Sequence, residues 1–266
     1  MIKCNFHTHT AFCDGKNTPE EMVLSAISKG FSAIGFSGHS YTDFDESYCM
    51  SREGAKKYIA EINRLKAVYK DKIQIYLGIE ADYFSNEDLS PFEYVIGSVH
   101  YVYKNGEFIP IDENVQILID AVNTHYNGDF LTLAEDYFSL VSRVNGDIVG
   151  HIDLISKFNE DGSLFDETSM RYIRAAENAV KALVSKGKIF EINTGAMSRG
   201  YRKTPYPSEN ILHLIKKHGG KIMINSDAHD ADSMDFAFDE AIILAKKCGF
   251  SETFIFDGTL FKSIKI

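Results

Sequence analysis

Two pairs of potential metal ligands are conspicuous because only one residue separates the members of each pair. His7 and His9 form the first pair near the start of the chain, and Asp227 and His229 form the second near its end. Side chains two positions apart in an extended chain point to the same side, so both members of a pair can bind one ion. Imidazole and carboxylate ligands together suit zinc, manganese or iron. One such pair alone is a weak signal.

Further side chains of the same chemistry are spread along the chain, each directly after a short apolar run. These residues are His39, Glu80, His100 and His151. If such groups converge on one face of a fold, they repel and desolvate one another unless cations are present. Asp14 is a further candidate ligand, although with Gly15 it also forms a sequence typical of a turn. Taken together, these residues predict a metal site.

The elements that must position these residues can be predicted from the apolar pattern. The expected strands are 2–6, 33–37, 73–79, 94–98, 147–150, 188–193 and 221–225, with a late edge strand at 253–256. The expected helices are 19–29, 51–69, 114–125, 130–144, 166–185, 208–217 and 233–248. The first helix has clear boundary signals: Thr18 as N-cap, Glu21 three residues later, and Gly30 just past its end.

Strands that alternate with helices pair in parallel through right-handed crossovers. Seven such units favour an α/β barrel over an open sheet, although the sequence does not exclude a doubly wound fold. We expect one domain over residues 1–266, because no linker, low-complexity tract or repeat of fixed period interrupts the pattern. The candidate ligands fall at the carboxyl ends of the predicted strands, and in βα barrels that end carries the active site.

Composition narrows the classes of function. The chain of 266 residues has a formal net charge of −10, which argues against a dedicated nucleic-acid binder, since such proteins are usually basic. Its four cysteines have no CxxC spacing, so we expect reduced thiols rather than a disulfide framework. No stretch approaches the roughly 20 apolar residues of a membrane span, and the N-terminus does not resemble a secretory signal. We expect a cytoplasmic protein.

In their order and spacing, the candidate ligands resemble the motifs of the polymerase-and-histidinol-phosphatase (PHP) family, from residue 5 to about residue 230. The resemblance implies a distorted (β/α)7 TIM-like barrel with a centre of three metal ions. One ion would be bound by His7, His9, Glu80 and Asp227, a second by Glu80, His100 and His151, and a third by Asp14, His39 and His229. Glu80 would then bridge two of the ions.

Within that family, the chain is similar to the free-standing histidinol-phosphatases. The similarity lies in the sequence Glu-Ile-Asn-Thr at 191–194, in Arg199 and in the sequence Tyr-Pro-Ser at 206–208. It implies a small-molecule substrate, L-histidinol phosphate, which is hydrolysed to L-histidinol and phosphate late in histidine biosynthesis. The attacking group would be a hydroxide that bridges two divalent ions, because such ions lower the pKa of water.

Three basic residues in this part of the chain could meet the phosphate. Arg199 is our first choice, Arg202 is a second candidate for phosphate binding, and Lys203 is an alternative. A guanidinium can bind phosphate bidentately, which an ammonium cannot. With Arg199, Glu80 and Asp227 are the expected catalytic residues.

Other functions remain open on the sequence. The same site could act on small nucleotides or other phosphate esters, or the metal cluster could belong to a non-catalytic regulatory module. An amidohydrolase barrel also begins with two histidines in this spacing, but it would be expected to have a bridging lysine where Glu80 stands. An acidic loop with Asp43, Asp45 and Glu46 could face a cationic group of the substrate or could simply be solvated.

Overall fold

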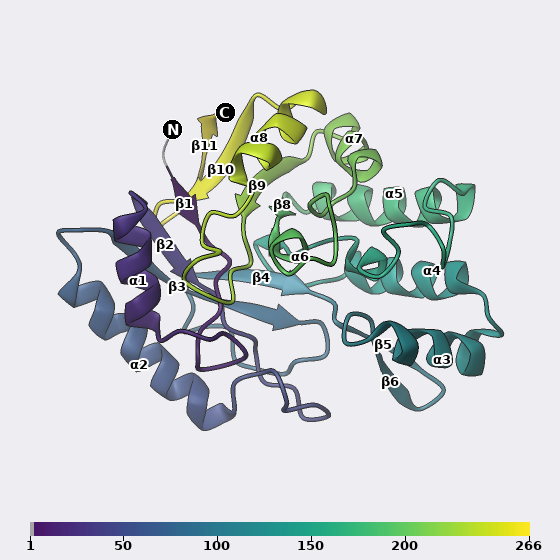
Figure 1. Ribbon diagram of the computed structural model, residues 1–266, viewed down its shortest axis with the longest axis horizontal. Helices are drawn as coiled ribbons and strands as arrows, with labels where there is room; N and C mark the ends of the chain where they lie inside the picture. Colours follow the sequence, from purple (N-terminus) through teal and green to yellow (C-terminus); the bar gives the residue numbers. More distant parts are fainter. Residues whose placement is uncertain (1–2) are drawn as a thin grey trace.

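The computed structural model describes residues 3–266, and its centre is a seven-stranded sheet (Figure 1). Neighbouring strands pair in parallel in the order β1-β2-β3-β4-β7-β8-β9. They are β1 (Cys4–Asn5), β2 (Ala33–Phe36), β3 (Gln74–Asp82), β4 (Tyr94–Ser98), β7 (Ile148–Val149), β8 (Ile189–Asn193) and β9 (Lys221–Asn225). The seven predicted strands are therefore confirmed, except that Ile2 of the first one lies outside the described residues.

The two outer strands of this sheet meet, which turns the sheet into a barrel. Thr8, after β1, forms an isolated parallel bridge with Ala228, after β9. The backbone N–H of His9 donates a hydrogen bond to the carbonyl of Ala228 at 2.8 Å. A side chain reinforces the seam, because the Oδ1 of Asn225 accepts a hydrogen bond from the N–H of Phe6 at 2.9 Å. The fold is a distorted (β/α)7 barrel, and the doubly wound alternative is excluded.

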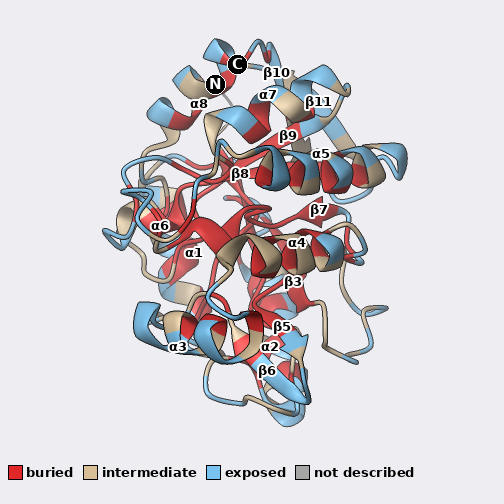
Figure 2. Ribbon diagram, turned by 90° about the vertical axis from the view of Figure 1, so that its right-hand side faces the viewer, coloured by how far each residue is buried: buried red, intermediate tan, exposed pale blue. Residues whose placement is uncertain are grey.

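Helices surround the barrel, and Figure 2 shows that their outward faces are exposed while the strands inside them are buried. They are α1 (Pro19–Ser28), α2 (Arg52–Val68), α3 (Val115–Tyr126), α4 (Phe130–Val141), α5 (Met170–Ser185), α6 (Gly195–Ser198), α7 (Glu209–Lys217) and α8 (Phe238–Lys247), with a 3₁₀ turn at Leu154–Ser156. Within residues 3–266, no helix is both long and apolar enough to cross a bilayer.

The predicted helix boundaries hold best where a capping signal is present. The Thr18 hydroxyl accepts the N–H of Glu21, and the Glu21 carboxylate accepts the N–H of Thr18 at 2.8 Å, which is the predicted capping box. Elsewhere, several helices are shorter than predicted. The helix expected at 233–248 begins at Phe238, and that expected at 166–185 begins only after its N-cap, Ser169.

Two antiparallel hairpins lie outside the barrel sheet and differ from the prediction. β10 (Glu252–Phe256) was expected as a late edge strand, but it pairs with β11 (Phe261–Lys265) instead of extending the barrel sheet. β5 (Tyr101–Lys104) and β6 (Glu107–Pro110) form a hairpin within a segment that was expected to be an irregular connection. The β5–β6 hairpin follows β4 directly, so it lies beside the carboxyl end of the barrel.

The interior of the barrel changes from apolar to polar toward its carboxyl end. At the apolar end, the ring of Tyr94 fills the space beside Gly35 and Gly78, where an added Cβ would lie 2.4 Å or less from Tyr94 atoms. In β8, Ile189 packs inside the barrel, whereas the next residue, Phe190, packs against the helices outside. The period of two along a strand therefore sends Glu191 inward as well. Glu191 therefore belongs to the polar part of the interior, which lies beneath the candidate active site.

Candidate active site

The structure brings all nine candidate ligands into one region at the carboxyl end of the barrel. We call them the imidazole–carboxylate cluster: His7, His9, Asp14, His39, Glu80, His100, His151, Asp227 and His229. Eight of them lie in the connections that follow the strands. Glu80 was predicted to follow its strand, but β3 extends to Asp82, so Glu80 lies within the strand. Its side chain points into the barrel because of the strand's alternation.

Glu80 is at the centre of the cluster, and its two carboxylate oxygens face different imidazoles. The Oε1 atom lies 2.9 Å from Nε2 of His151 and 3.4 Å from Nε2 of His100. The Oε2 atom lies 3.2 Å from Nε2 of His7 and 3.0 Å from Nδ1 of His39. With a side chain that is 1% exposed, Glu80 occupies the position a bridging carboxylate requires.

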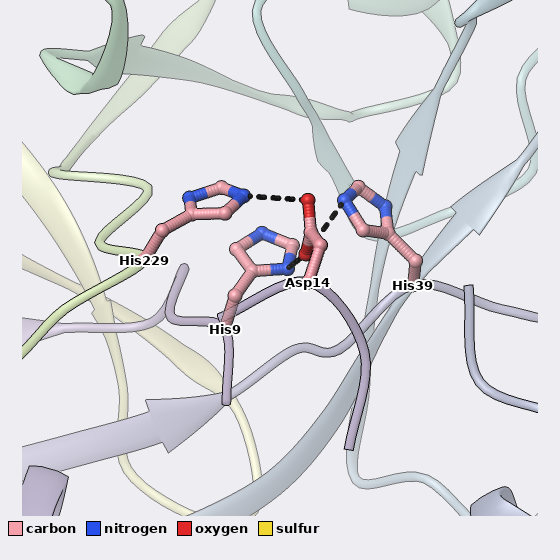
Figure 3. Close-up of side chains that lie close together, drawn as sticks. All are labelled: His9, Asp14, His39 and His229. Atoms are coloured by element: carbon pink, nitrogen blue, oxygen red, sulfur yellow. Dashed lines mark hydrogen bonds and ion pairs between the residues drawn. The ribbon is translucent and has the colours of Figure 1, made fainter. Parts of the chain in front are cut away.

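Asp14 forms the centre of a second, more exposed part of the cluster (Figure 3). Its Oδ2 atom lies 3.1 Å from Nε2 of His229, and its Oδ1 atom lies 3.6 Å from Nδ1 of His9 and 3.7 Å from Nε2 of His39. The turn expected at Asp14 is present too, because the N–H of Gly15 donates to the carbonyl of Thr10. The turn aims the Asp14 carboxylate at the three imidazoles.

Asp227 connects the cluster to a basic side chain. Its Oδ1 lies 3.1 Å from Nε2 of His9, and its Oδ2 accepts a hydrogen bond from Nη2 of Arg199 at 3.1 Å. Asp227 has a φ of 49°, in the left-handed region that Asp tolerates better than most residues. An added Cβ at Gly195, the first residue of α6, would lie 2.8 Å from Oδ2 of Asp227. Glycine at this position leaves room for the Arg199–Asp227 contact.

The donor atoms of the cluster fit divalent cations. The Nε2 atoms of His7 and His9 and the Oε2 atom of Glu80 are buried, and they find no hydrogen-bond partner among residues 3–266. Buried polar atoms without partners are costly, so their convergence is explained if a cation lies among them. Three groups have ligand atoms within 4.8 Å of one another: His7, His9 and Glu80; His39, Glu80 and His100; and His9, Asp14, His39 and His229. These groups overlap with the three expected sets, but they place His9 and His39 in two groups each and leave out His151 and Asp227.

The charged groups of the cluster shift one another's pKa values. Burial alone would lower the pKa of His100, but the carboxylates of Glu80 and Asp82 outweigh this effect and raise it to about 10. Burial would raise the pKa of Glu80, but the neighbouring imidazolium groups hold it well below its usual range. Burial and the positive charges of His229 and His39 lower the pKa of His9 to about 3. The carboxylates are therefore ionised and available to a cation.

A cavity of about 300 Å³ opens above the cluster. This volume suits a small molecule, because ligand pockets begin at roughly 300 Å³. We call six polar residues of its remaining lining the pocket wall: Asp45, Tyr48, Tyr101, Asp112, Lys157 and Arg199. The Nζ of Lys157 donates to the backbone carbonyl of Asp112 at 2.6 Å and lies 4.7 Å from the centre of the Tyr201 ring. The pocket wall thus carries both basic and acidic groups.

The structure does not bring Arg202 to this cavity. Its Nη1 donates to the carbonyl of Ser156 at 2.8 Å, and its guanidinium lies over the ring of Tyr206. Arg202 therefore joins the connection after β8 to the connection after β7, while Arg199 faces the cavity. Lys203 does not line the cavity either. The phosphate-binding role predicted for Arg202 has no support in this geometry.

Three residues of the site were given no role from the sequence, although Glu191 belongs to the Glu-Ile-Asn-Thr stretch at 191–194. Glu191 accepts a hydrogen bond from Nδ1 of His7 at 2.7 Å, and Asp82 lies 3.2 Å from Nδ1 of His100. Lys157 lies in the pocket wall. A signal existed for the two acids, because a charged residue in an apolar parallel strand is unusual unless it is paired. For Lys157 there was no comparable signal in its irregular connection.

Comparisons with known proteins agree with this geometry. The model of the PHP domain family matches residues 5–195. A histidinol-phosphatase of Lactococcus lactis is 30% identical over 97% of this chain and 96% of its own length. A probable histidinol-phosphatase of Schizosaccharomyces pombe is 28% identical over 98% of this chain and 93% of its own length.

A solved structure shows the same fold. It is the histidinol phosphate phosphatase of Lactococcus lactis complexed with zinc, L-histidinol and phosphate, with a TM-score of 0.72 and 25% identity over 98% of this chain and 99% of that one. The family match covers most of the barrel and all of the cluster except its last two members, Asp227 and His229. The candidate metal ligands at the carboxyl end of the barrel agree with these matches. The chain therefore belongs to the PHP family.

Proposed function

We propose that this protein is a metal-dependent phosphomonoesterase that hydrolyses L-histidinol phosphate to L-histidinol and phosphate in histidine biosynthesis. One observation carries the proposal: Arg199 and seven members of the imidazole–carboxylate cluster, all but His7 and His9, line the same small cavity. The Lactococcus lactis structure, complexed with zinc, L-histidinol and phosphate, supports this substrate class. We further propose that residues 1–266 act as one catalytic domain.

Two or three divalent ions, of zinc, manganese or iron, would be held by the nine residues of the cluster. Such ions lower the pKa of a water molecule and neutralise charge on phosphoryl oxygens. Glu80 would contribute to two ions, because its two oxygens face different imidazoles. Asp14, whose oxygens face three imidazoles, would hold the ion nearest to solvent.

The phosphate would lie between the cluster and the basic side of the pocket wall. Arg199 has a side chain that is 31% exposed, and its contact with Asp227 fixes the guanidinium beside the cluster. A guanidinium fixed in this way can offer two N–H donors to phosphoryl oxygens. Lys157 adds a second positive charge to the wall of the same cavity. Both would stabilise the negative charge that spreads over the phosphoryl oxygens during transfer.

The amine of the substrate would face the acidic side of the pocket wall. Of the three acidic residues in the loop 41–50 considered from the sequence, Asp45 alone lines the cavity. Its carboxylate accepts a hydrogen bond from Tyr101, and burial is outweighed by this bond and by those from Ser47, so its pKa is lowered. Asp45 is therefore ionised and can attract a protonated amine. Glu46, by contrast, bonds to Tyr41.

The direct test is phosphate release from L-histidinol phosphate, compared with p-nitrophenyl phosphate and several nucleoside monophosphates, with manganese or zinc present. We expect a kcat/KM for L-histidinol phosphate at least ~100-fold higher, which corresponds to about 2.7 kcal/mol of transition-state preference. Equal rates for all esters would contradict the substrate, and a better rate with a nucleotide would assign the site to nucleotides. No hydrolysis with any metal would contradict catalysis itself.

A further inference from the structure

Glu191 is a fully buried carboxylate that lies beneath the cluster rather than in it. It is the third residue of β8, its exposed fraction is 0%, and it does not line the cavity. A charged group in such a position is costly unless its charge is paired or hydrogen-bonded. Its contacts should therefore show what the carboxylate does.

The Glu191 carboxylate accepts hydrogen bonds from four donors among residues 3–266. The Oε2 atom accepts from Nδ1 of His7 at 2.7 Å and from Nδ2 of Asn225 at 3.0 Å. The Oε1 atom accepts from Nδ2 of Asn193 and, more weakly, from the backbone N–H of His151 at 3.5 Å. Among residues 3–266, its one ion-pair partner is His7.

The bond to Glu191 decides which nitrogen of His7 is free. When Nδ1 carries a proton and donates it to a carboxylate, the lone pair of a neutral imidazole is left on Nε2. The Nε2 atom of His7 lies 3.2 Å from Glu80 and 3.6 Å from Asp227, which is the side where a cation would lie. Glu191 thus selects the tautomer of His7 that can bind a metal and fixes the direction of its ring.

We propose that Glu191 is a positioning residue that sets the affinity of the cation site formed by His7, His9 and Glu80. This inference rests on the proposed function only in that it requires a cation at this site. Partners of this kind on metal-binding imidazoles typically contribute 10–100-fold to metal affinity. Asn225 and Asn193 hold the carboxylate still, so the bond to His7 is kept in one geometry.

The test is the variant Glu191→Gln, with metal affinity as the main readout. Glutamine keeps the size of the side chain but replaces one acceptor oxygen with an N–H₂ group, which faces the N–H donors of its neighbours. We expect zinc or manganese to bind at least ~10-fold more weakly in competition with a chromophoric chelator. We also expect kcat to recover toward the wild-type value as the metal concentration is raised.

The matched control is Glu93→Gln. Glu93 is a partly buried carboxylate before β4, where it accepts the N–H of Leu77 at 2.7 Å and bonds to Lys66, and neither of these partners belongs to the cluster. This variant should unfold at a lower temperature while its metal affinity stays unchanged. A Glu191→Gln protein that loses thermal stability in the same way, but binds metal as tightly as the wild type, overturns the proposal.

A second measurement needs no variant. Long-range ¹⁵N–¹H NMR spectra of the metal-loaded wild-type protein should show His7 protonated at Nδ1, and protonation at Nε2 would overturn the proposal. These outcomes can be distinguished from a failure of the proposed function. A wild type that binds metal and hydrolyses phosphate esters, with no effect of Glu191→Gln on affinity, removes only the role of Glu191, whereas a wild type that binds no metal removes the metal site itself.

Discussion

The imidazole–carboxylate cluster, of which all members but His7 and His9 line the cavity, and the pocket wall are built in different ways. The members of the cluster lie in β3 or in the first residues after other strands, and the side chains of His7, His9 and Glu80 are at most 1% exposed. The pocket wall comes from longer connections, and its Arg199 side chain is 31% exposed. Parallel strands thus fix the groups that would hold cations, while the longer connections supply the groups that would choose the ester.

This difference predicts two kinds of failure. Changes in the cluster should remove catalysis together with metal, because its side chains would hold the ions. Changes in the pocket wall should leave the metal content intact and alter how well a substrate is bound or turned over. Variants from each region therefore test whether the two regions differ in this way.

The largest effect is expected for Glu80→Gln. The variant keeps the shape of the side chain but removes the negative charge that faces His7, His39, His100 and His151. We expect kcat/KM to fall by about 10³-fold or more, and the bound metal, measured by plasma emission spectrometry, to fall by at least one ion for each chain. Glu135→Gln, which changes an exposed carboxylate on α4, should alter neither quantity. Full metal content and near-normal rates in Glu80→Gln would show that Glu80 is not a bridge.

The cluster could be predicted from the sequence because it depends on local spacing. His7 and His9, like Asp227 and His229, need only the period of two in an extended chain, and the strands before them could be recognised as short apolar runs. The barrel followed from the alternation of those strands with helices. The strand at 253–256 was expected, but its pairing with β11 was not. The apolar pattern of a strand does not identify the strand with which it pairs.

The pocket wall was predicted only in part because its contacts join distant parts of the chain. The Nζ of Lys157 contacts Asp112, 45 residues away, and Arg202 contacts Ser156, 46 residues away. Neither contact has a local signature, so spacing could not separate Arg199, which faces the cavity, from Arg202, which does not. The role of Glu191 was missed for a different reason. Its charge in an apolar strand was visible, but its partner His7 is 184 residues away.

The next effect in size is expected for Arg199→Ala. Removing the guanidinium takes away donors to the developing charge on the phosphate, so kcat/KM should fall by about 100-fold. Metal content should stay at the wild-type level, because Arg199 donates to Asp227 but offers no ligand atom. Arg199→Lys should recover only part of the loss, since an ammonium cannot bind phosphate bidentately. Loss of metal in Arg199→Ala would place this residue with the cluster and weaken the distinction.

A smaller loss of activity, with a large loss of stability, is expected for Arg202→Met. The positive charge of the guanidinium partly offsets the burial that raises the pKa of Asp153, a carboxylate whose Oδ2 accepts the N–H of Ser208 at 2.8 Å. Leaving that carboxylate without its counter-charge should lower the free energy of unfolding by about 3 kcal/mol, measured by urea denaturation. The folded variant should lose about 10-fold in kcat/KM, because the connection that carries Arg199 is less well fixed.

The double variant Arg202→Met with Asp153→Asn is the control for this explanation. It removes both charges, so it should recover part of the stability that the single variant loses. If Arg202→Met instead unfolds like the wild type and loses 100-fold or more in kcat/KM, then Arg202 meets the phosphate after all, and the orientation seen in the structure does not represent the working enzyme.

The smallest effect is expected for Asp45→Asn, which tests whether the acidic side of the pocket wall selects the substrate. Asparagine still accepts a hydrogen bond from Tyr101 but has no charge for a protonated amine. Because such a partly exposed ion pair contributes up to about 1 kcal/mol, KM for L-histidinol phosphate should rise about fivefold. KM for p-nitrophenyl phosphate, which has no amine, should not change. Glu46→Gln, in the same loop but outside the cavity, should affect neither ester, so an equal rise for both esters in Asp45→Asn would indicate a general disturbance of the loop rather than recognition of the amine.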